Sequence, residues 1–244
     1  MRIPRLCVFE PLVAGADIVL PEQAGEHVAR VLRLEHGHPL ILFNGDGREY
    51  RAEIAQLAKR AVTVRILDGG TPTDRESPLQ LTLAQGVARG EKMDLILQKA
   101  TELGVTRIVP LITGRTEVKL DAERTGRRLA HWQAVIAGAC EQSGRTTLPV
   151  LDAPLRLANW VVGLDASTGV RLALDPRGDV SPRTLPPLQV ATLVVGPEGG
   201  LSEQDLGMLD QADFHGLRLG PRILRTETAG LAAIAALQAL HGDV

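Results

Sequence analysis

The chain has 244 residues, with 27 Lys and Arg against 29 Asp and Glu, so its formal net charge is −2. This length is enough for two domains with apolar cores. The charge argues against a general polyanion-binding protein, and three Phe, two Trp and one Tyr are too few for a surface that stacks single-stranded bases.

The N-terminus and the cysteines are typical of a cytoplasmic protein. Met1–Arg5 lacks the apolar segment of a signal peptide, and no apolar run is long enough to span a membrane. Cys7 and Cys140 form no C-x-x-C pair, so we expect two buried thiols, no disulfide, no zinc and no other metal. We therefore predict a cytoplasmic location and no membrane partner.

Residues 1–70 have the pattern of a small β-barrel domain. One helix is predicted over Ala24–Leu34, and residues 71–78, which are rich in turn formers, predict a linker. The expected strands are short and rich in apolar residues: Leu6–Phe9, Pro39–Phe43, Glu49–Ile54 and Ala61–Leu67.

In residues 79–244 strands alternate with helices, which is typical of an α/β domain with a mainly parallel sheet. The predicted strands are Leu79–Ala84, Arg107–Ile112, Arg171–Asp175, Ala191–Val195 and Gly216–Leu219. The predicted helices are Glu91–Leu103, Ala122–Ser143, Glu203–Ala212 and Thr228–Leu240.

The last of these helices is apolar almost all round, so it must be buried in the monomer or paired with another subunit. We expect Gln238→Ala to be tolerated and Ile234→Asp to dissociate or unfold the protein, because the aspartate would bury an unpaired charge.

Two loops rich in glycine and proline each follow a predicted strand. The first, Gly196–Gly200, leads to Ser202, which is placed to cap a helix. The second, Gly220–Arg225, leads to the last helix. Their spacing matches neither a P-loop nor G-x-G-x-x-G, so a nucleotide phosphate is not the obvious ligand. Either loop alone could be an ordinary strand-to-helix turn, but the pair indicates one shared pocket.

The segments GPEGGLS and LGPRILRTETA resemble the signature of SPOUT methyltransferases of the ribosomal RNA small subunit methyltransferase E family. Further segments that resemble the family follow the same order: His27–Leu34, Leu42–Gly45 and Glu141–Arg145. The resemblance implies S-adenosylmethionine-dependent methylation of uridine N3 in 16S rRNA, within a small-subunit particle. It also implies a PUA-like N-terminal barrel, a trefoil knot in the C-terminal domain and a homodimer, which favours a subunit interface for the last helix.

The resemblance assigns the cofactor to the glycine loops, where glycines allow close approach of the backbone and leucines form apolar walls. The expected cofactor-binding residues are Leu174, Gly196, Gly199, Leu219, Gly220, Ile223, Leu224 and Thr228. No metal is needed, because the sulfonium already carries an activated methyl group.

Uracil N3 is a weak nucleophile until its proton leaves, so the catalytic site must favour the uridinate. Arg225 is the candidate cation for this, although it could instead be an exposed arginine paired with Glu227. Glu198 or Glu227 could take the proton, and Glu198 ranks slightly higher because it lies in the glycine loop. Glu198 could instead cap the following helix.

Arginines are the expected RNA contacts, although nine basic residues in the first 68 are balanced by nine acidic ones. In the N-terminal domain each of them could instead be a solvated surface residue. The candidates are Arg2, Arg5, Arg30, Arg33 and, at the end of the long helix, Arg145.

Two alternative functions stay open at this point. One is a non-catalytic rRNA-binding assembly factor, which the intact glycine loops disfavour. The other is a SPOUT enzyme that methylates a ribose 2′-hydroxyl or a tRNA base, which the N-terminal motifs disfavour.

Overall fold

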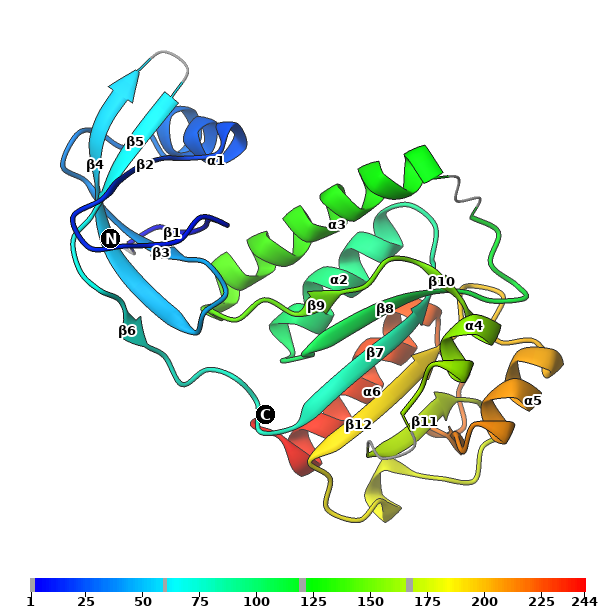
Figure 1. The fold of residues 1–244 in the computed structure, drawn as a ribbon. Coiled ribbons are helices and arrows are strands. Elements are labelled where there is room, and N and C mark those ends of the chain that lie inside the picture. The colour runs from blue at the N-terminus through cyan, green and yellow to red at the C-terminus, as the bar shows by residue number, and fades with distance from the viewer. Residues whose placement is uncertain (1–2, 59–60, 119–121, 166–168) are drawn as a thin grey trace. The chain divides into compact units, whose positions relative to one another are not determined.

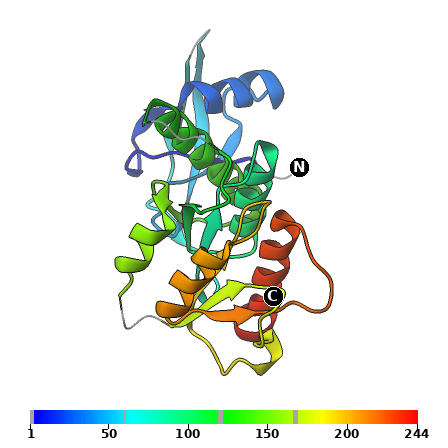
Figure 2. The same cartoon turned by 90° about the vertical axis from the view of Figure 1, so that its right-hand side faces the viewer.

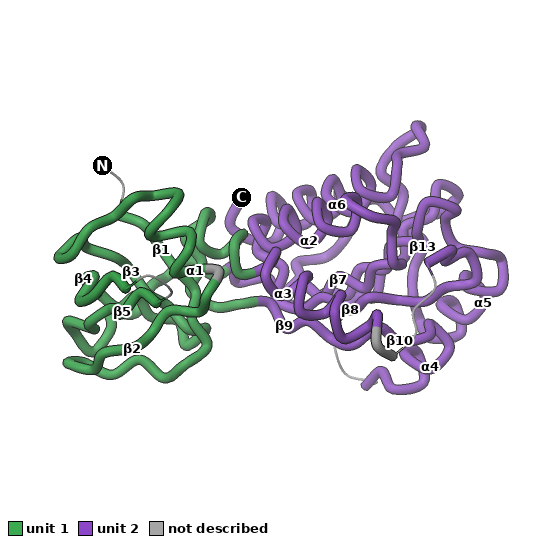
Figure 3. The backbone as a smooth tube through the Cα atoms, turned by 90° about the horizontal axis from the view of Figure 1, so that it is seen from above, with its two compact units in different colours: residues 1–76, 137–148 green, residues 77–136, 149–244 purple. Residues whose placement is uncertain are grey.

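The computed structural model describes residues 3–58, 61–118, 122–165 and 169–244. The chain divides into two compact units, Met1–Glu76 with Ala137–Leu148 and Ser77–Ile136 with Pro149–Val244 (Figure 3). The sequence-based division into domains 1–70 and 79–244 stays a proposal. It places residues 137–148 in the C-terminal domain, whereas their contacts group them with the first unit.

The first unit is built on a six-stranded sheet in the order β1-β3-β4-β5-β2, with β6 paired to β4. Among the strand pairs of the described residues in this sheet, only β1–β3 is parallel. In β5 the apolar residues Val62, Val64 and Ile66 alternate with outward-facing residues, as a sheet with one buried face requires. The strands are β1 Arg5–Cys7, β2 Asp17–Val19, β3 Pro39–Phe43, β4 Arg48–Ala58, β5 Ala61–Ile66 and β6 Thr71–Pro72.

The helix predicted over Ala24–Leu34 exists, but its bounds and its regularity were wrong. The α-helix α1 covers Glu22–Glu26 and continues as a π-helical turn, η1, over His27–Val31. The Leu32 N–H donates to the His27 carbonyl at 2.9 Å, and Arg33 leaves the turn with φ +52°. A regular period of 3.6 residues therefore could not describe this segment.

Cys7 and Cys140 belong to the first unit, and both are buried, as predicted for small apolar side chains. Burial raises the pKa of the Cys7 thiol to about 12 and that of Cys140 to about 11. Both thiols are therefore protonated and unreactive near neutral pH.

The second unit contains a seven-stranded sheet in the order β10-β8-β7-β12-β11-β13, with β9 paired to β8 (Figure 1). All of its ladders are parallel, which confirms the predicted α/β architecture. The strands are β7 Gln80–Gly86, β8 Arg107–Ile112, β9 Val150–Leu151, β10 Leu155–Arg156, β11 Val170–Leu174, β12 Val190–Val195 and β13 His215–Leu217.

Helices cover both faces of this sheet. Contacts join α2 to α6 on one face and α4 to α5 on the other (Figure 2). The helices are α2 Glu91–Glu102, α3 Ala122–Ser143, α4 Leu157–Val162, the 3₁₀ turn η2 Pro182–Thr184, α5 Glu203–Gln211 and α6 Thr226–His241. Trp160 of α4 packs on Phe214 with ring centroids 5.8 Å apart, within the core below α4 and α5.

One side of α6 is buried within its own unit, including Ala233, Ile234 and Leu237. Gln238 is 0% exposed; its Nε2 donates to the Leu103 carbonyl at 2.8 Å and its Oε1 accepts from Ser77 Oγ at 2.6 Å. The expectation that alanine is tolerated at position 238 therefore does not hold. Among the described residues, no helix is long and apolar enough to cross a membrane.

Candidate active site

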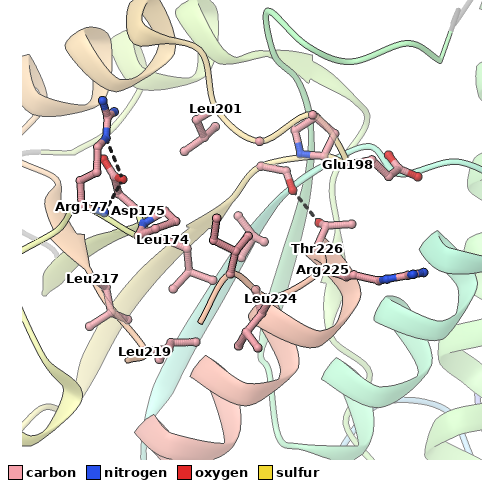
Figure 4. A pocket seen from close by; sticks show the side chains of 18 of the residues that line it. Leu174, Asp175, Arg177, Glu198, Leu201, Leu217, Leu219, Leu224, Arg225 and Thr226 are labelled. Atoms are coloured by element: carbon pink, nitrogen blue, oxygen red, sulfur yellow. Dashed lines mark hydrogen bonds and ion pairs between the residues drawn. The ribbon is translucent and has the colours of Figure 1, made fainter. Parts of the chain in front are cut away.

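A cavity of about 460 Å³ opens at the carboxyl ends of β11, β12 and β13 (Figure 4). Three loops that follow these strands supply most of its lining. This is the edge of a parallel sheet where ligands usually bind. The lining comprises residues 174–177, 195–201, 217, 219, 220 and 222–226, together with Arg115, Glu203, Leu206 and Ala229. Both loops that the sequence singled out therefore meet at one pocket.

The glycine loop after β12 is closed by its own backbone. A Cβ on Gly196 would lie 2.6 Å from the carbonyl carbon of Gly200 and 2.8 Å from the nitrogen of Leu201, so no larger residue fits. Gly200 has φ +71°, and its N–H donates to the Pro197 carbonyl at 2.8 Å. The shape of the loop itself therefore already requires a glycine at position 196.

Ser202 caps α5, as predicted. Its Oγ accepts from the Asp205 N–H at 3.1 Å, while Asp205 Oδ2 accepts from the Ser202 N–H at 2.8 Å. Asp205 is buried and also accepts from the Gly114 N–H at 3.1 Å. Arg115, which the sequence analysis missed, donates to the Gly199 carbonyl at 2.7 Å. The loop after β8 therefore holds the glycine loop in place.

Glu198 does not cap α5, so that alternative was wrong. Its carboxylate accepts from the Arg89 N–H at 3.0 Å and from Lys92 Nζ at 3.4 Å, beside the start of α2. Partial burial raises its pKa, but these bonds and the Lys92 charge outweigh burial and hold the pKa below its usual range. Glu198 is therefore ionised at neutral pH and acts as a link between two loops.

Arg225 is the last residue before α6 and lines the pocket, and its exposed side chain points away from Leu174 and Leu219 (Figure 4). It forms no ion pair with Glu227 or with any other described residue. Glu227 lies outside the pocket lining, and its Oε2 is a buried atom without a hydrogen-bond partner. Of the three predicted catalytic residues, Arg225 and Glu198 therefore reach the pocket.

The threonine at the pocket is Thr226 rather than the predicted Thr228. Thr228 is exposed and does not line the cavity, whereas Thr226 is 7% exposed and its Oγ1 donates to the Gly196 carbonyl at 2.6 Å. Figure 4 shows this bond between the start of α6 and the glycine loop. Thr226 and Thr228 both lie in the first turn of α6, so the helical period alone did not indicate which of them lies at the pocket.

The other predicted cofactor residues line the pocket: Leu174, Gly196, Gly199, Leu219, Gly220, Ile223 and Leu224. Gly220 has φ +119°, a conformation that favours glycine. A charged group that was not predicted lies at the opposite wall, where Arg177 Nη1 and Glu203 are 2.9 Å apart and the Arg177 N–H donates to Asp175 at 2.9 Å. The pocket is therefore lined by apolar side chains on one side and by charged side chains on the other.

Of the predicted RNA-binding arginines, two are exposed and two are buried. The fifth, Arg2, lies outside the described residues. Arg30 is exposed, 3.0 Å from Glu26, and Arg33, two residues beyond the end of η1, is exposed and has a left-handed backbone conformation. Either side chain can reach a ligand.

Arg5 and Arg145 are buried inside the first unit. The Arg5 side chain is 8% exposed, lies 3.2 Å from Glu49 and packs over the Phe43 ring. The Arg145 side chain is 4% exposed, and its Nε donates to Glu76 at 3.1 Å. These contacts give both arginines a structural role.

No group of three or more His, Cys, Asp or Glu among the described residues could hold a metal ion. The pocket offers backbone groups, leucine side chains, the charged wall and the guanidinium groups of Arg222 and Arg225 as its binding chemistry.

Comparisons with known proteins agree with this arrangement. A family model described as RNA methyltransferase domain matches residues 75–238, and one described as RNA methyltransferase PUA domain matches residues 20–67. The ribosomal RNA small subunit methyltransferase E of Bacillus subtilis is 32% identical over 229 residues, which cover 89% of each chain. Its counterpart from Buchnera aphidicola subsp. Schizaphis graminum is 30% identical and covers 100% of this chain and 98% of its own.

Two solved structures share the fold over essentially the whole chain. A protein of Legionella pneumophila in complex with bound cofactor SAM has a TM-score of 0.95 and 40% identity, and covers 100% of both chains. A ribosomal RNA small subunit methyltransferase E of Neisseria gonorrhoeae bound to S-adenosyl methionine has a TM-score of 0.90 and 38% identity, and covers 99% of both. The sequence resemblance is thus confirmed, and the chain belongs to the ribosomal RNA small subunit methyltransferase E family.

Proposed function

We propose that this protein transfers a methyl group from S-adenosylmethionine to N3 of a uridine in 16S rRNA. The observation that carries the proposal is Arg225, which directly precedes α6 at a pocket built from three loops and, like Arg222, is exposed and has no ion-pair partner among the described residues. A free cation beside a cofactor pocket is what stabilisation of a uridinate needs.

S-adenosylmethionine fits the chemistry of the lining. Leu174, Leu219 and Leu224 offer apolar walls for an adenine ring, and the glycine loop brings main-chain groups close to a ligand. The S-adenosylmethionine bound to the similar Legionella and Neisseria proteins supports the choice of this cofactor. When bound, the cofactor supplies an activated methyl group.

Arg225 would act on the nucleophile. Removing the N3 proton spreads negative charge over the two uracil carbonyl oxygens, and a guanidinium beside one of them stabilises that charge. Because no described carboxylate neutralises Arg225, its full charge is available to the substrate. The residue therefore lowers the pKa of the uracil imide and raises the fraction of uridinate.

Neither predicted carboxylate is well suited to take the proton. The lowered pKa of Glu198 makes its carboxylate a weak base, and Glu227 lies outside the pocket lining. We therefore assign Glu198 to holding the glycine loop, and assign proton removal to water once Arg225 has lowered the pKa of the imide.

The remaining parts of the prediction concern assembly and substrate. We propose that the PUA-like unit holds the rRNA strand through exposed arginines such as Arg30 and Arg33, in the cytoplasm and on a small-subunit particle. The side of α6 that faces away from the core of its own unit, with Ala232, Ala235 and Ala239, is the proposed homodimer surface. The trefoil knot implied by the family resemblance also belongs to this proposal.

Nucleoside analysis tests the reaction. Small subunits that lack the modification are incubated with the protein and methyl-labelled S-adenosylmethionine, and the 16S rRNA is digested and separated by liquid chromatography. Label in N3-methyluridine is expected, with a reverse-transcription stop one nucleotide before the site. Label on a ribose oxygen or on tRNA would identify a different SPOUT activity. Binding to the particle without transfer would identify an assembly factor.

A further inference from the structure

A buried polar cluster joins three segments of the chain beside the pocket. Gln85, near the end of β7, is 0% exposed, and its Nε2 donates to the Gly86 carbonyl at 2.9 Å. The same nitrogen donates to Thr226 Oγ1 at 3.1 Å and lies 3.4 Å from the Gly196 carbonyl. Thr226 Oγ1 in turn donates to the Gly196 carbonyl. The end of β7, the glycine loop and the first turn of α6 are thus held together by one amide and one hydroxyl.

The polar groups of this cluster lower the stability of the fold. Gln85 lies in the interior of a parallel sheet, where apolar residues are usual, and its Oε1 is buried without a hydrogen-bond partner. A leucine would occupy a similar volume without leaving an unpaired oxygen. The two bonds that Nε2 donates, to the Gly86 carbonyl and to Thr226 Oγ1, are therefore the reason for an amide at this position.

The segments approach closely at the same place. A Cβ on Gly86 would lie 2.5 Å from Pro197 Cδ and 2.6 Å from the Pro197 nitrogen, so β7 and the glycine loop are in backbone contact. Small shifts of Thr226 would therefore be transmitted to the glycine loop through the shared Gly196 carbonyl.

Arg225 depends on this cluster for its position. It precedes Thr226 directly, its backbone is extended with φ −67° and ψ 155°, and no side-chain bond caps the start of α6. Its own side chain is exposed and has no ion-pair partner in the part of the chain that the structure describes. The origin of the Arg225 side chain is fixed by the anchoring of the next residue by Gln85 and Gly196, together with the bond that the Arg225 carbonyl accepts from the Ala229 N–H at 2.7 Å.

We infer that Gln85 and Thr226 are positioning residues for Arg225, through the hydrogen bonds that fix the first residue of α6 against β7 and the glycine loop. The inference rests on the proposed function, because it presupposes that Arg225 acts in methyl transfer. A misplacement of about 1 Å in a catalytic group lowers a rate by about a hundredfold.

Single-turnover methyl transfer to 16S rRNA, at saturating cofactor, is the measurement. Thr226→Val keeps the shape of the side chain and removes the hydroxyl, so we expect a rate at least about tenfold lower. Thr226→Ser keeps the hydroxyl and should stay within about threefold of the wild type. Thermal melting checks that the variants are folded, and Thr226→Ala replaces the valine if that variant is not.

A double-mutant cycle separates positioning from a general structural effect. Thr226→Val is repeated in the Arg225→Ala background, where a residue that acts only through Arg225 should slow the reaction no further. The same slowing in both backgrounds would overturn the inference, and so would transfer at the wild-type rate by Arg225→Ala or by Thr226→Val. Total label is counted whatever nucleotide carries it, so the cycle stands even if the product is not N3-methyluridine.

Discussion

Replacing Gln238 with alanine is the most direct test of how α6 is held in the second unit. The side chain is 0% exposed and joins α6 to the Leu103 carbonyl and to Ser77 Oγ. Alanine removes both bonds and leaves a small cavity. An unsatisfied buried polar group costs about 1–3 kcal/mol, so two of them give a loss of about 2–6 kcal/mol in the free energy of unfolding.

The assay is thermal unfolding followed by circular dichroism. For a unit of this size, 1 kcal/mol shifts Tm by about 2–4 °C, so Gln238→Ala should lower Tm by about 4–24 °C. Gln133→Ala is the matched control, because Gln133 is exposed on α3. A Tm for Gln238→Ala within about 2 °C of that control would refute the argument that these two bonds stabilise α6.

Much of the second unit could be predicted from local pattern. The predicted bounds of Arg107–Ile112 and Ala122–Ser143 match β8 and α3, because a buried parallel strand is a continuous apolar run and a long helix repeats its apolar face every 3.6 residues. The segment Val150–Val162 was missed. It contains two strands of two residues each and a helix of six, which are too short to show a period.

The pocket loops were visible in the sequence because glycine and proline mark turns, but the contacts that shape the pocket were not. Thr226 meets Gln85 across 141 positions, and Arg115 meets Gly199 across 84. The burial of Arg5 and Arg145 could not be predicted for a similar reason. The sequence shows the charge of Arg145 but not that its carboxylate partner, 69 positions away, lies beside it in the same unit.

Four further predictions follow from the site and the core. Glu198→Gln should keep the rate of methyl transfer within about threefold and leave the pH–rate profile unchanged, because an amide oxygen can still accept from Arg89 and the residue is not the base. Iodoacetamide should label Cys7 and Cys140 at pH 8 at least about a hundredfold more slowly in the folded protein than in urea, because burial raises both thiol pKa values and so removes the thiolate. Gly138→Ala should raise the free energy of unfolding by about 1 kcal/mol in urea titrations, because the position is exposed on α3 and a Cβ there meets nothing within 4 Å. Arg225→Ala should lower the rate of methyl transfer about a hundredfold, or about 3 kcal/mol in activation free energy, because it removes one preorganised charge from the developing uridinate. Its affinity for S-adenosylmethionine, measured by titration calorimetry, should change little, because Arg225 is assigned to the substrate rather than to the cofactor. A large loss of cofactor affinity with an unchanged single-turnover rate would place Arg225 in the cofactor site instead.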